Sequence, residues 1–215
     1  MPHDPGRQQR LDAVRRQQQR AERRRHAGIW GGAALVLVAI AGSVTFAIVG
    51  EQRSRPDLSA VESFTVGQGH VTTPVSYEQT PPAGGEHAPV WLNCGRYTQP
   101  VPNENAVHSM EHGAVWITYR TDLPATDVQA LQAATPDTYA VLSPYPDLSA
   151  PVVVSAWGKQ LKLSGVDDAR LAAFVRAYRQ GPQTPEAGAA CTGGLDPTTG
   201  SGGVPMPAPT TMSAS

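Results

Sequence analysis

One long apolar run stands out from the pattern of hydrophobic and polar positions along the chain. Residues 27–49, AGIWGGAALVLVAIAGSVTFAIV, form a stretch of 23 positions without a charged side chain. A helix needs about 20 apolar residues to cross a hydrocarbon core of about 30 Å, so this run is long enough to span a membrane. Trp30 lies near one end of the run, where aromatic side chains are frequent at the membrane interface. The pattern predicts one transmembrane helix over residues 27–49.

Shorter segments with strand and helix periodicity fill the second half of the chain. Alternating β-branched and aromatic residues predict strands, and apolar residues at intervals of three or four predict helices. We expect strands over residues 114–120, 138–145 and 150–158, the last continued across a turn by residues 159–165, and helices over residues 124–135 and 166–181. The resulting β-α-β-β-α order predicts an α+β fold, in which two or three helices pack on a small mixed sheet. The same order also matches half of a thioredoxin-like fold.

The charge of the N-terminal segment predicts how the chain is oriented. Residues 1–26 contain eight arginines and three acidic residues. Because cytoplasmic flanks of membrane spans are enriched in Lys and Arg, we expect a basic cytoplasmic tail over residues 1–26, and an extracytoplasmic domain at the cell membrane after the span. A cleaved signal peptide ending near residues 39–41 is the alternative, and it also exports the domain. The net charge of −1 predicts no nucleic-acid partner.

Composition divides the remainder of the chain into three parts. Residues 50–60 are expected to form a polar juxtamembrane linker, and residues 61–193 the folded extracytoplasmic domain. The first half of that domain is dense in Pro and Gly, which predicts long loops. Residues 194–215 are mostly Gly, Pro, Thr and Ser, so they bury too little apolar surface to offset their ordering entropy. They are predicted to be a disordered tail.

The chain has two cysteines, Cys94 and Cys191, both on the expected extracytoplasmic side. An even number of cysteines in an oxidising compartment indicates a disulfide. The alternative is a pair of separate buried thiols. The lack of a C-x-x-C motif argues against a redox-active pair.

The most concentrated chemistry of the chain lies in residues 103–113, NENAVHSMEHG. Asn103 or Asn105 is expected to cap a short helix that ends near His112, with Gly113 as its stop. Glycine takes up the left-handed backbone conformation that commonly ends a helix, and a β-prone run begins directly after it.

Histidines cluster in the same region. Four of the six histidines, His70, His87, His108 and His112, fall in the predicted extracytoplasmic part. Side chains four positions apart on a helix project from one face, so the spacing of His108 and His112 suits two ligands of one ion. We expect His87 and His70 to join them from separate loops, with Met110 as a further ligand.

The ligand types favour copper, with zinc as the alternative. Imidazole suits both metals, and a thioether favours Cu(I). Structural zinc sites usually use cysteine, and no thiolate is free if the disulfide forms. Glu111 is expected to accept a hydrogen bond from a ligating ring and thereby to fix its tautomer. The leading hypothesis is a membrane-anchored, non-enzymatic protein that binds a transition metal.

Two other functions fit the same residues. HSMEH matches H-x-x-E-H, the pattern of inverted zinc peptidases and therefore of a zinc-dependent hydrolase. Such a site needs a longer helix and a distant third ligand, whereas Gly113 predicts an early helix end. The remaining hypothesis is a metal-free cell-envelope interaction or structural module, in which the histidines only stabilise the fold.

Four segments of the chain resemble one protein family: PPAGGEH, CGRY, VHSMEHGAVWITY and AACTGG. Over about residues 60–195 the chain is similar to the domain of unknown function 3105 family, whose members are mainly bacterial and membrane-anchored. The resemblance implies an N-terminal anchor, an exported domain and typical family positions at His87, Cys94, His108, Glu111, His112 and Cys191. It implies no particular activity, substrate or cofactor.

Overall fold

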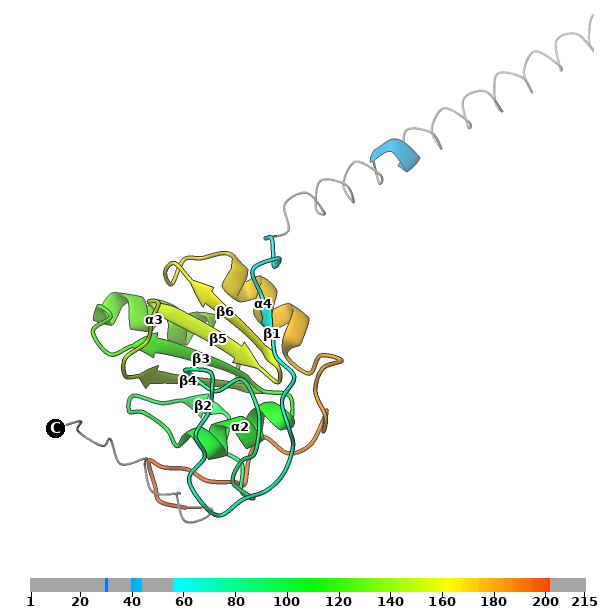
Figure 1. Cartoon of the computed structure of the whole chain (residues 1–215). Coiled ribbons are helices and arrows are strands. Elements are labelled where there is room, and N and C mark those ends of the chain that lie inside the picture. Colours follow the sequence, from blue (N-terminus) through cyan, green and yellow to red (C-terminus); the bar gives the residue numbers. More distant parts are fainter. Residues whose placement is uncertain (1–29, 31–39, 44–55, 202–215) are drawn as a thin grey trace, which may run out of the picture. The chain divides into compact units, whose positions relative to one another are not determined.

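The computed structural model describes Trp30, residues 40–43 and residues 56–201 (Figure 1). The chain divides into two units, residues 1–55 and residues 56–215. In the first unit the described residues are helical. The second unit contains the sheet, the three helices and the histidine cluster described below.

The predicted fold class needs a correction at its N-terminal end, where it placed a transmembrane helix before the domain. Among the described residues, no helix combines the length and the apolar character needed to cross a membrane. Most of the predicted span over residues 27–49 lies outside the described part of the chain, as do the predicted basic tail over residues 1–26 and residues 50–55.

A six-stranded mixed sheet forms the centre of the second unit, with the strand order β1-β6-β5-β3-β4-β2. Strand β4 pairs in parallel with β2 and with β3, and the other pairs are antiparallel. The strands are β1 Glu62–Ser63, β2 Gly95–Arg96, β3 Val115–Arg120, β4 Ala140–Tyr145, β5 Val152–Ala156 and β6 Lys159–Leu163. The α+β class and the mixed sheet agree with the prediction. The two edge strands β1 and β2 enlarge the sheet, and both come from loop-rich segments without strand periodicity.

Three helices accompany the sheet: α2 Asn103–Glu111, α3 Ala125–Ala134 and α4 Arg170–Tyr178. They begin and end within a few residues of the segments predicted. The predicted asparagine cap of α2 is wrong, because Pro102 is the N-cap residue and makes no side-chain cap. Asn105 instead donates from Nδ2 to the carbonyl oxygen of Val90 at 2.6 Å, and Asn103 donates to the hydroxyl of Tyr145 at 3.3 Å. Both amides therefore anchor the helix laterally.

Alternation along β3 divides the core between the two faces of the sheet. Val115, Ile117 and Tyr119 point to one face, where they belong to an apolar cluster with Leu131 of α3 and Phe174 of α4. This alternation has the period of two that the sequence shows. The first face of the sheet is thus covered by α3 and α4.

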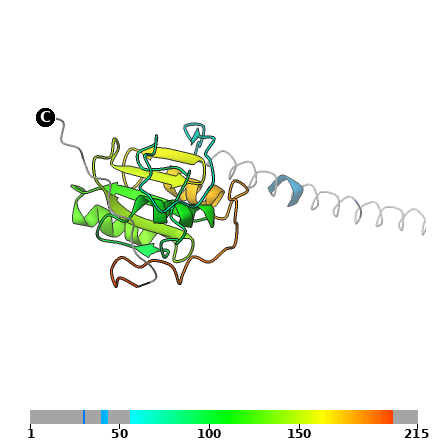
Figure 2. The ribbon, with the colours of Figure 1, turned by 60° about the horizontal axis from the view of Figure 1, so that its bottom comes forward.

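The second face of the sheet is covered by α2 and the loops around it (Figures 1 and 2). Trp116 points to this face and shares an apolar cluster with Val107 and Met110 of α2 and with Leu92 and Leu195 from the flanking segments. All five side chains are fully buried. Burial of α2 along its apolar side fixes the direction in which its polar side faces.

The C-terminal segment of the described chain is tied to the loop before β2. Cys94 and Cys191 form the predicted disulfide, with Cα atoms 5.4 Å apart. Leu195 forms a bridge with Leu92 and is fully buried. Residues 194–201 were predicted to belong to the disordered tail, and within them Leu195 is part of the core. Residues 202–215 lie outside the described residues.

Candidate metal centre

The C-terminal half of α2 and its C-cap residue, His112, supply three polar side chains to one side of the helix. His108, Glu111 and His112 are separated by three and four positions, so they project in similar directions. Met110 points the other way and is completely buried in the apolar cluster with Trp116. The thioether expected among the ligands therefore lies in the hydrophobic core.

Gly113 ends the helix, as the sequence predicts, with a φ of 100°. A side chain at this position would collide with Gln180, whose Nε2 lies 2.1 Å from where a Cβ would stand. Gln180 donates from this nitrogen to the carbonyl oxygen of His112, and its backbone N–H donates to Gly113 at 2.9 Å. The glycine thus lets a distant segment close over the end of α2.

His70 and His87 come from two loop segments that pair with each other. The backbone N–H of Val71 donates to the carbonyl oxygen of His87 at 2.8 Å, and the N–H of His87 donates to Gly69 at 2.9 Å. This short parallel bridge brings the two imidazole rings to a centroid distance of 5.0 Å. Two histidines that are separated by many residues in the sequence thereby face the same side of α2.

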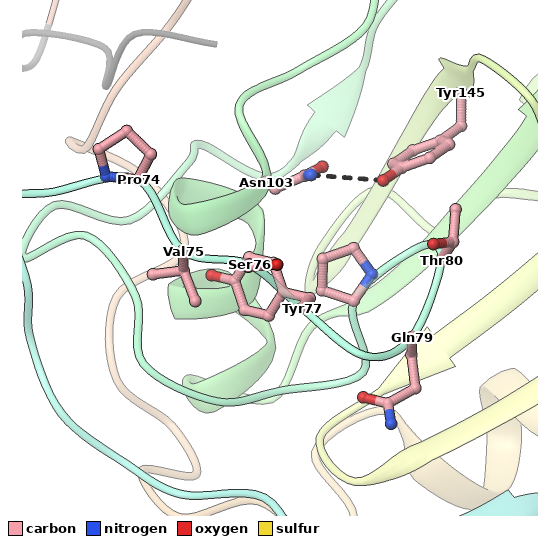
Figure 3. Close-up of a pocket in the computed structure, with 9 residues that line it drawn as sticks. Pro74, Val75, Ser76, Tyr77, Gln79, Thr80, Asn103 and Tyr145 are labelled. Carbon is pink, nitrogen blue, oxygen red and sulfur yellow. Dashed lines mark hydrogen bonds between the residues drawn. The ribbon is translucent and has the colours of Figure 1, made fainter. Parts of the chain in front are cut away.

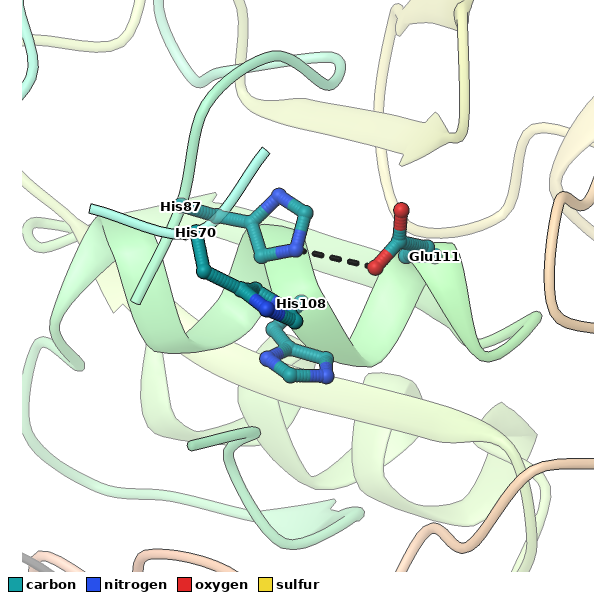
Figure 4. Close-up of side chains that lie close together, drawn as sticks. All are labelled: His70, His87, His108 and Glu111. Carbon is teal, nitrogen blue, oxygen red and sulfur yellow. Dashed lines mark ion pairs between the residues drawn. The ribbon is translucent and has the colours of Figure 1, made fainter. Parts of the chain in front are cut away.

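His70, His87, His108 and Glu111 form a single group, and their potential ligand atoms all lie within 4.8 Å of one another (Figure 4). His87, His108 and Glu111 are 0, 4 and 5 % exposed, whereas His70 is exposed. Three imidazoles and a carboxylate are ligands that zinc, copper and other first-row transition metals accept. This group could hold a metal ion.

Backbone carbonyl groups fix the tautomers of three histidines in this centre. Nδ1 of His87 lies 2.8 Å from the carbonyl oxygen of Gly85, and Nδ1 of His108 lies 2.7 Å from that of Ala88. Nδ1 of His112 lies 2.6 Å from the carbonyl oxygen of Ala190. A carbonyl oxygen can only accept, so each Nδ1 carries the hydrogen. In the neutral rings the lone pair is then on Nε2.

The Nε2 atoms of His108 and His112 face each other, and Nε2 of His87 faces the carboxylate of Glu111. Nε2 of His108 lies 3.0 Å from Nε2 of His112, so two lone pairs point at each other when both rings are neutral. Nε2 of His87 is buried and lies 2.9 Å from Oε2 of Glu111, which is an ion pair when the ring is protonated, and it has no hydrogen-bond partner within the part of the chain that the structure describes (Figure 4). Burial lowers the pKa of His108 from 6.5 to about 4, opposed by the hydrogen bond to Ala88 and reinforced by the neighbouring histidines. His108 is therefore neutral at pH 7.

The model of one protein family, described as proteins of unknown function (DUF3105), matches residues 70–193. The chain belongs to the DUF3105 family. No curated protein and no solved structure matches it. The part that matches the DUF3105 model begins at His70 and contains every residue of the metal group and both cysteines.

Glu186 and Trp91 of this DUF3105 domain also lie at the centre, and neither was among the residues that the sequence predicts for the site. Oε2 of Glu186 lies 3.4 Å from Nε2 of His112. The ring of Trp91 lies 5.2 Å from that of His112 and 5.9 Å from that of His108. Glu186 stands in a Pro- and Gly-containing segment without periodicity, so only the chain's path over the end of α2 reveals its position.

A separate pocket of about 310 Å³ opens beside the N-terminal end of α2 (Figure 3). Tyr77, Asn103 and Tyr145 are among its lining residues, and none of the four residues of the metal group lines it. The pocket therefore contributes nothing to the geometry of the metal group.

Proposed function

We propose that this DUF3105 domain binds a transition-metal ion through its histidine and glutamate group. One observation carries the proposal. His87 and His108 each use Nδ1–H to bond a backbone carbonyl, which leaves Nε2 as the free ring nitrogen, and with His70 and Glu111 they form a group whose ligand atoms all lie within 4.8 Å of one another. Metal-bound histidines characteristically donate their second ring N–H in this way, which fixes the tautomer and orients the ring.

The arrangement is costly for a domain that binds no cation. With His87 neutral, its Nε2 is a buried polar atom without a hydrogen bond, which costs about 1–3 kcal/mol. With His112 also neutral, the facing nitrogen atoms of His108 and His112 add lone-pair repulsion. A metal ion would accept these lone pairs and neutralise the Glu111 carboxylate.

The imidazole and carboxylate donors favour a divalent ion. Of copper and zinc, we propose that copper is bound more tightly. The thioether that favoured Cu(I) is absent from the group, because Met110 lies in the hydrophobic core. Imidazole and carboxylate donors suit both Cu(II) and Zn(II). For a given set of such ligands, affinity generally rises toward Cu(II) and falls again at Zn(II).

We propose that the domain binds the metal ion and does not use it to catalyse a reaction. Glu111, the expected base of an H-x-x-E-H hydrolase, lies among the donors at 2.9 Å from His87. A carboxylate that coordinates the metal cannot at the same time act as the free base of that mechanism. The disulfide between Cys94 and Cys191 supports an oxidising, extracytoplasmic compartment for the domain.

The test is metal content of the full chain, purified with a tag that contains no histidine and loaded with Cu(II) or Zn(II). We expect at least one equivalent of bound metal by elemental analysis and a higher unfolding temperature. Glu111→Gln is expected to weaken binding, and Glu78→Gln, on an exposed glutamate, is the matched control. Less than about a tenth of an equivalent of either metal, without a thermal shift, would overturn the proposal in favour of a metal-free structural module.

A further inference from the structure

Six potential ligands surround the C-terminal end of α2, and they separate into two sets. His70, His87 and Glu111 are the first set, and His112 and Glu186, 3.4 Å apart, begin the second. His108 is close to both, since it belongs to the group of the first set and its Nε2 lies 3.0 Å from that of His112, and we assign it to the second set. Building on the proposed function, we propose that the centre holds two metal ions, one in each set. Each set has two imidazoles and one carboxylate, a combination that binds zinc in known sites and leaves a coordination position open.

The closest donor pairs have the spacing of ligands on one ion. Two donors about 2.1 Å from a tetrahedral ion lie about 3.4 Å from each other. Nε2 of His87 and Oε2 of Glu111 are 2.9 Å apart, and the Nε2 atoms of His108 and His112 are 3.0 Å apart. Glu186 extends the second pair at 3.4 Å from His112. Each pair therefore needs only a small opening to bind an ion.

One ion does not serve all six donors. Opposite ligands about 2.1 Å from the same ion are at most about 4.2 Å apart. The group whose ligand atoms lie within 4.8 Å of one another includes His108 but neither His112 nor Glu186. With its Nδ1 donated to Ala88, His108 has a single free nitrogen and binds one ion at a time. His112, whose Nε2 lies 3.0 Å away, places it in the second set.

The second set is built by the segment that closes over α2. The backbone N–H of Glu186 donates to the carbonyl oxygen of Glu111 at 3.1 Å. Nδ1 of His112 donates to Ala190, the residue before the disulfide-bonded Cys191. These bonds hold both members against the helix, so the Glu186 carboxylate is more than an incidental surface charge. Its side chain is 54 % exposed, which leaves the second ion open to solvent.

The number of ions and their proximity are measured on the full chain titrated with Cu(II). Equilibrium dialysis with elemental analysis is expected to give two equivalents for the wild type. Two Cu(II) ions a few ångströms apart couple magnetically, so the electron paramagnetic resonance signal should account for less spin than the copper present. About 3.5–4 Å is the usual separation in two-metal sites.

The Glu186→Gln variant tests whether the centre holds two ions or only one. Because its side chain is largely exposed, the change leaves the core intact. We expect it to remove the second equivalent, or to weaken its binding about tenfold or more, and to restore a spin count equal to the copper content. Glu111→Gln should affect the other equivalent, and Glu78→Gln should keep both.

The outcomes distinguish the two proposals. One equivalent in the wild type, unchanged in Glu186→Gln, overturns the two-ion centre and leaves the proposed function intact. Two equivalents in both proteins, with full spin intensity, show that the second ion is adventitious and also overturn it. No bound metal in the wild type overturns both proposals.

Discussion

Gly113 controls how the segment that carries Glu186 meets α2, and Gly113→Ala tests that control. The residue has a φ of 100°, which disfavours any side chain. Positive φ costs an alanine about 1–2 kcal/mol. The new Cβ would also stand 2.1 Å from Nε2 and 2.8 Å from Cδ of Gln180, so this side chain must leave the carbonyl oxygen of His112. Loss of that hydrogen bond adds about 1 kcal/mol.

The sum predicts that Gly113→Ala destabilises the domain by about 2–3 kcal/mol, which corresponds to a decrease in Tm of about 4–12 °C for a domain of this size. Gly188→Ala is the matched control, because Gly188 has a φ of 87° and nothing within 4 Å of a new Cβ. It should show only the backbone cost, about 1–2 kcal/mol. Urea denaturation followed by circular dichroism measures both values.

A second comparison isolates the contact itself. Gln180→Ala removes the amide that the new methyl group would displace. In that background, Gly113→Ala should cost about as much as Gly188→Ala. If Gly113→Ala is no more destabilising than Gly188→Ala in the wild-type background, the close approach of Gln180 does not constrain the end of α2.

Three further predictions test other parts of the structure. Replacing Cys94 and Cys191 by serine opens a cross-link with a sequence separation of 97 and should cost up to about 4–5 kcal/mol in urea denaturation; an unchanged midpoint would contradict the chain-entropy argument. Met110→Leu should leave Cu(I) and Cu(II) affinities unchanged and cost less than about 1.5 kcal/mol, whereas weaker Cu(I) binding would return the thioether to the ligand set. Hydrogen bonds from Arg170 hold the pKa of Asp168 far below its usual range, so the folded state favours the carboxylate. The stability that wild type has over Asp168→Asn, about 2 kcal/mol at pH 7, should therefore decline as pH falls below about 4, and a constant difference between pH 7 and pH 3 would refute this linkage.

The local pattern of apolar and polar residues was sufficient to predict most of the strands and helices. Strands β3 to β6 and helices α3 and α4 lie where alternation and helical spacing predicted them, because one buried face imposes a period on each segment. The helix end at Gly113 was also predictable, since a left-handed conformation favours glycine. The edge strands β1 and β2 are two residues each, too short to show a period.

The asparagine residues of α2 show where local rules stop. Asn103 and Asn105 have the side chain of a helix cap, yet both donate to groups distant in sequence. Capping is worth about 1 kcal/mol, so a buried tertiary hydrogen bond can outweigh it. The sequence shows that these two side chains can form hydrogen bonds. It does not show which partner groups the fold brings near them.

By itself, the sequence indicated the histidines of a metal site, those between residues 70 and 112, with His108 and His112 on one helical face. It also predicted a disulfide between its two cysteines, with separate thiols as the alternative, and the structure confirms the disulfide. Tertiary structure decided the rest. It placed Met110 in the core, Glu111 among the donors and Glu186 beside His112. The physical reason is that ligand sets form where loops and helices meet. Which segment packs against α2, and which distant backbone groups bond there, depend on partners far apart in the sequence, and a periodic pattern does not identify those partners.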